Sequence, residues 1–199
     1  MKILPPYPTG LVPDKNQVYS PREDTFLLLR AANNEILPAD TVLEVGIGSA
    51  YIIWNLSPCK LALGTDINPH AALLAHTQGV NIIRTDFADG LKKYFSLVIF
   101  NPPYLPTSPE ERGDDWLEFA LDGGPDGREP VNAFCTRILN VLNDSGRVVM
   151  LISSLQDFSS CEEIFSKTGF NYTVVDTEKM EDGEELRVYK LTRKNQMIF

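Results

Sequence analysis

The chain alternates between short apolar segments with strand character and segments with helical periodicity, and this alternation restricts the fold more than any other feature. Strands are expected at residues 41–45, 61–65, 80–85, 97–100 and 147–152, with helices at about 50–57, 69–77, 130–142 and 159–168. Such alternation is typical of a parallel sheet with helices on both faces. Two further strands, 171–177 and 185–191, flank a charged turn and are expected to form an antiparallel hairpin. The sequence therefore predicts a doubly wound α/β fold, with a mostly parallel seven-stranded sheet and an antiparallel last strand.

The domain organisation is expected to be simple, because the chain shows no internal repeat and no linker. An extended N-terminal arm, residues 1–18, precedes a single domain over residues 19–199. The first helix is expected to have Ser20 as N-cap, Pro21 at its first position and Glu23 completing a capping box. The irregular stretch 101–128 is too long for an ordinary connection in a compact domain, which indicates a functional segment.

Charge and cysteine content exclude several classes of protein. The 18 basic and 27 acidic residues give a net charge of −9, which argues against a protein that holds long DNA or RNA through phosphate contacts. Apolar runs are too short to cross a bilayer, and prolines interrupt the N-terminus, so we expect a cytoplasmic protein without a secretory signal. Only two histidines and three cysteines without a CxxC pair are present, so no metal site is expected.

A glycine turn follows the strand expected at 41–45. Gly46 and Gly48 would let the backbone approach a ligand closely at the carboxyl edge of the sheet, where doubly wound folds bind ligands. A glycine pair by itself more often only closes a tight turn. A dinucleotide-binding fingerprint would need a third glycine at the position of Tyr51, and that glycine is absent.

Acidic residues at the ends of three successive strands favour a ligand site over a simple turn. Asp66 ends the second strand, where a carboxylate can accept hydrogen bonds from both hydroxyls of a ribose. Asp86, next to Phe87, suits the amino group and the flat face of a purine. Glu44 would repel a pyrophosphate but suits a cationic sulfonium amino acid. The pattern therefore indicates S-adenosylmethionine rather than a dinucleotide.

The run Asn101-Pro102-Pro103-Tyr104 follows the fourth strand directly and faces the same edge. The side-chain oxygen of Asn101 and the carbonyl of Pro102 can both accept hydrogen bonds from a planar NH₂ group, and Tyr104 can stack on its face. An amide or exocyclic amine is a weak nucleophile, because its lone pair is conjugated. Two fixed acceptors can turn that lone pair toward a methyl donor and stabilise the developing positive charge.

These residues resemble the NPPY class of S-adenosylmethionine-dependent methyltransferases, and within that class the HemK-like branch. The resemblance is closer to the short archaeal and eukaryotic enzymes that methylate class-I release factors. The resemblance covers about residues 17–192 and rests on four runs in addition to the NPPY motif: YSPREDTFLLL (19–29), LEVG (43–46), TDINP (65–69) and GGPDGRE (123–129). It implies a Rossmann-like class I methyltransferase fold. One departure is Ala50, where the family usually has the last glycine of GSGSG.

The resemblance also implies roles for individual residues. The catalytic run would be Asn101, Pro102, Pro103 and Tyr104, with Asn101, Pro102 and Tyr104 in contact with the target amide. The residues expected to bind the cofactor are Tyr19, Thr25, Glu44, Gly46, Gly48, Asp66, Ile67, Asp86, Phe87 and Asn101. The implied activity is methyl transfer to the side-chain amide nitrogen of the glutamine in a release factor's GGQ loop.

Two surfaces are candidate partner sites. The apolar third strand, 80–85, should lie at the sheet edge, where an exposed strand needs cover. Related release-factor methyltransferases bind a small zinc-containing activator there, so the resemblance implies such a partner, while cover by the chain's own arm is an equally open interpretation. The acidic stretch 104–128 is either a solvated loop or a surface for a basic protein substrate, and Trp116 within it is expected to be a packing anchor.

Other functions compete with this interpretation. Adenine N6 and guanine N2 present the same planar NH₂ group, so the runner-up is a nucleic-acid amino methyltransferase, which the negative charge and the lack of a target-recognition domain disfavour. A catalytically inactive, cofactor-binding subunit would not need the intact NPPY run. The sequence leaves methylation of a small molecule open.

Overall fold

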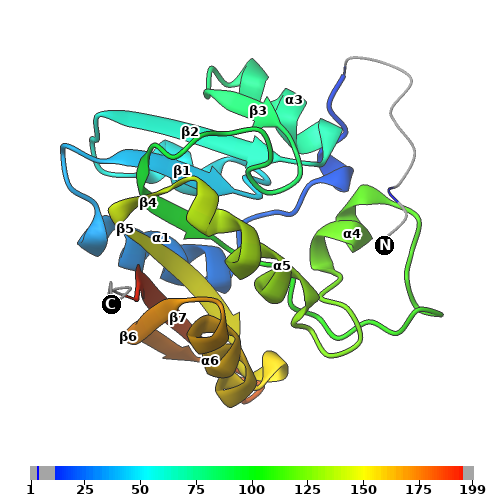
Figure 1. The fold of residues 1–199 in the computed structure, drawn as a ribbon. Coiled ribbons are helices and arrows are strands. Elements are labelled where there is room, and N and C mark those ends of the chain that lie inside the picture. The colour runs from blue at the N-terminus through cyan, green and yellow to red at the C-terminus, as the bar shows by residue number, and fades with distance from the viewer. Residues whose placement is uncertain (1–3, 5–11, 195–199) are drawn as a thin grey trace.

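The computed structural model describes Leu4 and residues 12–194, and its core is one seven-stranded sheet with the strand order β3-β2-β1-β4-β5-β7-β6 (Figure 1). The pairs β3–β2, β2–β1, β1–β4 and β4–β5 are parallel, and β7 runs antiparallel to both β5 and β6. The predicted fold is confirmed, with the antiparallel last strand inserted beside β5. The strands are β1 Thr41–Val45, β2 Leu61–Asp66, β3 Ile82–Arg84, β4 Phe95–Phe100, β5 Leu142–Ser153, β6 Phe170–Lys179 and β7 Glu185–Arg193.

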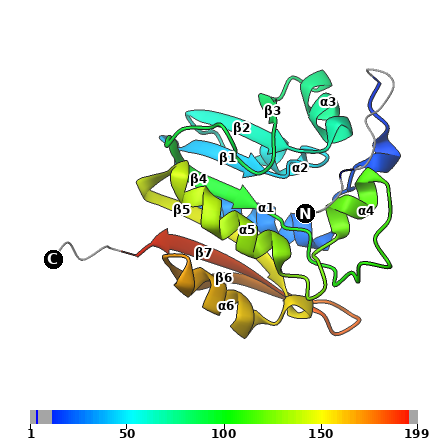
Figure 2. The ribbon, with the colours of Figure 1, turned by 45° about the vertical axis from the view of Figure 1, so that its right-hand side comes forward.

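Helices cover both faces of the sheet. In Figure 2, α5 and α6 lie on the near face and α1 lies on the far face. Apolar contacts place α2 with α1, and α3 next to α2. The α-helices are α1 Glu23–Glu35, α2 Tyr51–Asn55, α3 Pro69–Thr77, α4 Trp116–Leu121, α5 Glu129–Arg137 and α6 Phe158–Lys167, and the 3₁₀ turns are η1 Lys15–Gln17, η2 Ile138–Asn140 and η3 Ser154–Gln156.

The central strand β4 shows why the two layers of helices form. Successive side chains of a strand point to opposite faces, and both faces of β4 are apolar. Leu97 and Ile99 pack in the cluster that contains α1, whereas Val98 and Phe100 pack in the cluster that contains Phe134 of α5. All four β4 side chains are at most 2% exposed, so the strand is fixed from both sides.

The first helix starts later than the sequence predicts. Arg22 is its N-cap and Glu23 its first residue, so the prediction of Ser20 as N-cap and Pro21 at the first helical position is wrong. The hydroxyl of Thr25 accepts the backbone N–H of Arg22 at 3.4 Å, which replaces the predicted capping contact. Because Arg22 is extended (φ −135°, ψ −170°), the helix cannot continue back through the preceding residues.

Other boundaries differ for local reasons. The segment predicted as irregular at 101–128 contains the short helix α4, whose N-cap Asp115 accepts the N–H of Glu118. The helix predicted at 130–142 ends as an α-helix at Arg137 and continues as the 3₁₀ turn η2. The helix predicted at 50–57 and the strand predicted at 80–85 are both shorter, as α2 and β3.

The N-terminal arm is only partly described, because residues 5–11 lie outside the described part of the chain. Within 12–18, η1 forms a 3₁₀ turn where extended chain is predicted. The turn is held against α3, where Asp14 donates its N–H to Nδ1 of His70 at 3.0 Å and Val18 packs on Ala71 and Leu74. The arm is therefore attached beside the carboxyl end of β2.

A buried ion pair links the central strands near their amino-terminal ends, away from the glycine turn that follows β1. Arg147 of β5 contacts the carboxylate of Asp40, just before β1, at 2.6 Å, and Ser96 of β4 donates to the same carboxylate at 2.6 Å. Burial alone would raise the pKa of Asp40, but the hydrogen bonds from Arg147, Ser96 and the Leu37 N–H lower it below its ordinary value. This network links three strands away from the glycine turn.

Replacing Arg147 with methionine should lower the free energy of unfolding by about 3 kcal/mol, because the Asp40 carboxylate would stay buried without its cation. Urea unfolding at neutral pH measures the loss. Lys167→Met is the matched control, since Lys167 forms an exposed ion pair with Glu163 at 2.7 Å and should contribute less than about 1 kcal/mol. Equal losses in the two variants would contradict this account of the network.

Candidate active site

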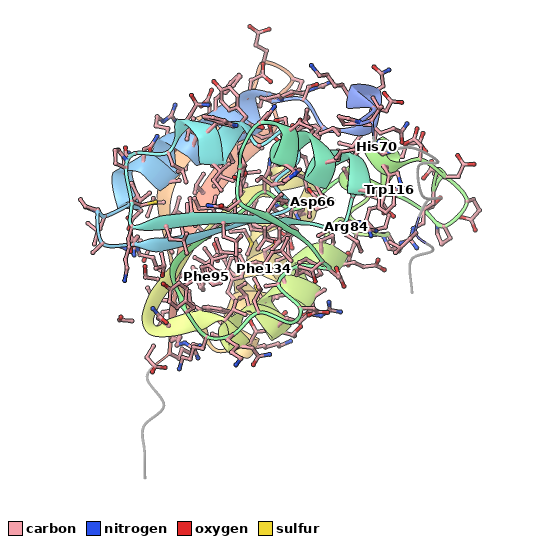
Figure 3. The ribbon with its side chains drawn as sticks, turned by 90° about the horizontal axis from the view of Figure 1, so that it is seen from above. Asp66, His70, Arg84, Phe95, Trp116 and Phe134 are labelled. Carbon is pink, nitrogen blue, oxygen red and sulfur yellow. The ribbon has the colours of Figure 1, made fainter. Side chains whose placement is uncertain are left out.

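A cavity of about 1420 Å³ opens at the carboxyl ends of β1, β2 and β4. In Figure 3, Asp66 and Trp116 lie toward this end of the molecule, and Phe95 lies toward the other. Sites for one small ligand usually measure about 300–1,000 Å³, so this cavity has room for a cofactor and a substrate side chain together. Every residue predicted to bind the cofactor or substrate lines it: Tyr19, Thr25, Glu44, Gly46, Gly48, Asp66, Ile67, Asp86, Phe87, Asn101, Pro102, Pro103 and Tyr104.

The glycine turn after β1 lines the cavity. Gly46 (φ +65°) and Gly48 (φ +52°) both adopt left-handed backbone conformations, which glycine accepts without strain. Ala50 also has a left-handed conformation, with φ +65°, and is the N-cap of α2. The departure from a glycine at this position thus places a mildly strained alanine at the start of α2.

Two carboxylates lie beside this turn. Asp66 accepts the N–H of Gly48 at 2.9 Å and that of Asn68 at 2.8 Å, and burial raises its pKa to about 6. Glu44 is 4% exposed and accepts the N–H of Ile53 at 2.9 Å. Burial, with a further contribution from the charge of Asp66, raises the pKa of Glu44 well above its ordinary value. A bound cation or hydroxyl donor would stabilise the ionised form of either group.

Asp86 and Phe87 lie on the other side of the turn, with a basic neighbour that the sequence did not indicate. Asp86 pairs with Nη1 of Arg137 at 2.7 Å, and the guanidinium of Arg137 lies 5.3 Å from the centre of the Phe87 ring. The Phe87 ring packs edge-on against Phe100 and Phe134. Arg137 ends α5, far along the chain from Asp86, and no sequence pattern links the two.

The NPPY run, which follows β4, lines the same cavity. The carboxamide of Asn101 donates from Nδ2 to Oδ2 of Asp24 at 3.0 Å, whereas its buried Oδ1 has no hydrogen-bond partner among the described residues. Pro102 is buried, and Tyr104 is partly buried. Burial, and then the charge of Asp24, raise the pKa of the Tyr104 phenol, which therefore stays protonated at neutral pH.

Sequence reasoning missed several residues that complete the cavity. Asp24 belongs to the run YSPREDTFLLL, but the sequence analysis gives it no role. Its position in the first turn of a helix was the available signal. Met180 and Glu184, at the tip of the β6–β7 hairpin, line the side near Tyr104, and only the fold brings them there. Trp116 is 2% exposed and packs edge-on against Phe119, as expected of a packing anchor.

The described part of the chain shows neither a metal-binding cluster nor a membrane-spanning helix. Within Leu4 and residues 12–194, no group of three or more His, Cys, Asp or Glu side chains is arranged to hold a metal ion. Cys135 and Cys161 are buried, and Cys59 is partly buried. No helix in that part of the chain has the length and apolarity needed to cross a membrane.

Two relatives of known sequence decide the family. The chain is 33% identical to the methyltransferase HEMK2 of Homo sapiens over 195 residues, which cover 89% of this chain and 91% of that protein. It is 38% identical over 147 residues to a provisionally named protein N5-glutamine methyltransferase of Methanocaldococcus jannaschii, with 70% and 74% of the two chains covered. The chain belongs to the HemK-like family of methyltransferases.

The fold comparison agrees with this family. A chain from the E. cuniculi Mtq2–Trm112 complex, described as responsible for the methylation of the translation termination factor eRF1, superposes with a TM-score of 0.74 and 25% identity. The match covers 89% of this chain and 99% of that one. No model of a known protein family matches the chain. The HemK-like chain is therefore an enzyme with a Rossmann-like methyltransferase fold.

The Asp66 carboxyl should titrate near pH 6 in the free protein, which carbon NMR of labelled aspartate can measure, with Asp66→Asn to assign the signal. Its folded pKa lies above the ordinary value of 3.8, so protonated Asp66 favours the folded state. This contribution to stability is complete below about pH 4 and is lost as the pH rises through 6. A titration near pH 4 would show that the partial burial of Asp66 does not raise its pKa.

Proposed function

We propose that this methyltransferase transfers a methyl group from S-adenosylmethionine to the side-chain amide nitrogen of the glutamine in the GGQ loop of a class-I translation release factor. The observation that carries the proposal is the buried, unpartnered Oδ1 of Asn101 in the same cavity as the glycine turn. The names of the similar proteins support it, since one is a glutamine methyltransferase by name and another belongs to a complex that methylates eRF1. A release-factor substrate would place the reaction in the cytoplasm.

The cavity residues fit S-adenosylmethionine, which supplies an electrophilic methyl group on a positively charged sulfur. Asp66 would accept hydrogen bonds from the ribose hydroxyls, and Asp86 with Phe87 would hold the adenine. Glu44 would favour the positively charged amino-acid part, because its own charge lies buried without a cation beside it. The residues assigned beside them are Tyr19, Thr25, Gly46, Gly48 and Ile67.

The substrate side follows from the acceptors of the NPPY run. A buried oxygen without a hydrogen bond costs about 1–3 kcal/mol, and a target NH₂ group relieves that cost at Oδ1 of Asn101. The Pro102 carbonyl would accept the second N–H, and the Tyr104 ring would cover the face of the amide. These contacts strengthen as positive charge develops on the nitrogen, so they lower the barrier more than they stabilise the bound substrate.

Proton removal needs no side-chain base in this arrangement. An amide nitrogen that has gained a methyl group is a strong acid and releases its proton to water. The nearby phenols do not compete for this role, because burial and the charge of Asp24 raise the pKa values of Tyr19 and Tyr104. Asn101 and Pro102 therefore act by orientation and charge stabilisation.

Charge on the loop 104–128, part of which lines the cavity, favours a protein substrate over a nucleic acid. Both arginines of the loop 104–128 are paired with carboxylates, Arg112 with Asp122 and Arg128 with Asp126. Acidic side chains of the same loop stay exposed, namely Glu110, Glu111, Asp114 and Glu118. Such a surface repels a phosphate backbone and attracts a basic protein surface.

A small partner subunit at the β3 edge is the second part of the proposal. β3 pairs with β2 on one side, and Ile83 in it is 41% exposed. Trp54, 57% exposed, lies beside a shallow hollow formed with Ala62 and Val80. The similar E. cuniculi chain forms a complex with Trm112. We assign this apolar edge to the small zinc-binding activator that the family resemblance implies. Val18 and the η1 turn of the arm lie against α3, and residues 1–3 and 5–11 are outside the described part.

Asn101→Ala should lower kcat on the release factor by about a hundredfold or more, as expected for the loss of one preorganised polar group. The affinity for S-adenosylmethionine, measured by calorimetry, should fall much less, because Glu44, Asp66 and Asp86 make most of the cofactor contacts. Near-normal turnover by this variant would refute the mechanism.

The matched substrate control is a release factor whose GGQ glutamine is changed to glutamate. A carboxylate offers no N–H to Asn101 and would repel both acceptors, so methylation should disappear. Continued methylation of that variant, or methyl transfer to tRNA, rRNA or DNA in place of the release factor, would reject the proposed substrate.

Ile83→Asp should prevent complex formation with the small zinc-binding subunit on co-expression, because it puts a charge on the apolar edge of the sheet. The affinity of the chain for S-adenosylmethionine should stay the same. Leu37→Asp is the control, since Leu37 is 58% exposed in the loop between α1 and β1 and should leave the complex intact. A wild-type chain that is monodisperse and fully active alone would refute an obligate activator.

A further inference from the structure

Asp24 is a buried carboxylate in direct contact with the proposed reaction centre. It lies in the first turn of α1, is 3% exposed, and lines the same cavity as the NPPY run. Its Oδ2 accepts hydrogen bonds from Nδ2 of Asn101 at 3.0 Å and from the hydroxyl of Tyr19 at 3.1 Å. Its Oδ1 accepts from the N–H of Thr25 at 2.6 Å and from the Thr25 hydroxyl at 3.1 Å. Four donors therefore hold this carboxylate in one orientation.

The chemistry of a carboxylate decides which way the Asn101 side chain faces. An ionised carboxylate only accepts hydrogen bonds, whereas a carboxamide has one donor end and one acceptor end of nearly equal size. Asp24 therefore selects the rotamer in which Nδ2 of Asn101 faces α1. The acceptor Oδ1 is the end left without a partner. In the flipped rotamer, Asn101 would present an NH₂ group to a target NH₂ group, and two donors would meet.

The charge of Asp24 has a second consequence for the acceptor. A hydrogen bond from an amide N–H to a carboxylate polarises the amide and increases the negative charge on its oxygen. Oδ1 of Asn101 then becomes a stronger acceptor for a nitrogen that is gaining positive charge. The carboxylate lies near the N-terminus of α1, where the helix dipole favours a negative charge.

We propose that Asp24 is the positioning residue of this methyltransferase, which holds the Asn101 carboxamide in the acceptor orientation that the target amide requires. Tyr19 and Thr25 complete the arrangement by fixing the carboxylate. The inference rests on the proposed transfer to an amide nitrogen, and it adds a residue that acts through Asn101 without touching the transferred methyl group.

Asp24→Asn is the sharpest variant because it keeps the size of the side chain. The new carboxamide must direct its oxygen to the N–H of Thr25, since that backbone donor cannot move, and its NH₂ group then faces Asn101. Asn101 must flip to accept this donor. We expect kcat on the release factor to fall about a hundredfold, with the S-adenosylmethionine affinity changed less than about threefold. Glu163→Gln, at an exposed acid of α6 that does not line the cavity, is the matched control and should leave kcat unchanged.

A double-mutant cycle separates positioning from a structural role. If Asp24 acts through Asn101, then Asp24→Asn should cost less than about threefold in kcat when introduced into Asn101→Ala. A loss of about a hundredfold in both backgrounds would overturn the inference, as would an unchanged kcat in the single variant. If Asp24→Asn does not fold, Tyr19→Phe replaces it, and a loss of several-fold in kcat should again disappear in Asn101→Ala. An equal loss in both backgrounds would overturn the inference.

A measurement without substrate keeps this inference separate from the proposed function. In ¹⁵N-labelled wild-type protein, the side-chain NH₂ of Asn101, assigned with Asn101→Ala, should exchange with solvent at least about tenfold more slowly than in Asp24→Ala. Equal exchange rates would overturn the role of Asp24 whatever the substrate proves to be. A wild-type chain that shows the protected amide but does not methylate the release factor would refute the substrate and leave the positioning of Asn101 supported.

Discussion

Buried negative charge is the constraint around which this cavity is built. Asp24 and Glu44 are 3% and 4% exposed, and Asp66 is buried enough for its pKa to rise to about 6. Within the described chain, none of the three forms an ion pair with Lys or Arg; each is held by backbone N–H donors, and Asp24 also by hydroxyls and the Asn101 amide. A buried charge without a cation is costly, and a positively charged ligand reduces that cost. The site is therefore arranged to favour a cation.

The parallel sheet is what brings these charges together. Strand β1 ends at Val45, β2 ends at Asp66 and β4 ends at Phe100, so the residues that follow each strand meet at one edge. The ion pair between Arg147 and Asp40 lies at the opposite edge, where its own cation balances the carboxylate. Asp40 is thus paired with an arginine, whereas Asp24, Glu44 and Asp66 have no such cation among the described residues. Asp86 is the exception among the cavity carboxylates, because it pairs with Arg137.

The sequence was sufficient wherever local patterns set the structure. The strand at 41–45 and the helix at 69–77 have the predicted bounds, because apolar runs and an Asn-Pro helix start define them locally. The start of α1 was predicted too early, because Arg22 and not Ser20 is the N-cap. The backbone N–H of Arg22 donates to the hydroxyl of Thr25 within the helix. The predicted cofactor and substrate residues all reach the cavity, since strand ends must converge. Arg137, Met180 and Glu184 were not predictable, because only tertiary packing brings them to this site.

The pair of Asp86 and Arg137 shows how such a tertiary contact bears on the cofactor side. Both side chains are about half exposed, so the pair adds little to stability. The pair matters instead for the hydrogen bonds that Asp86 can still accept. A carboxylate can accept about four, so Asp86 with Arg137 on its Oδ2 can also accept one from the proposed adenine amino group. Arg137 also lies over the Phe87 ring, which in turn packs on Phe100 at the end of β4. The Asp86 and NPPY parts of the cavity are therefore connected through the packed rings of Phe87 and Phe100, and Phe100 ends the strand directly before Asn101.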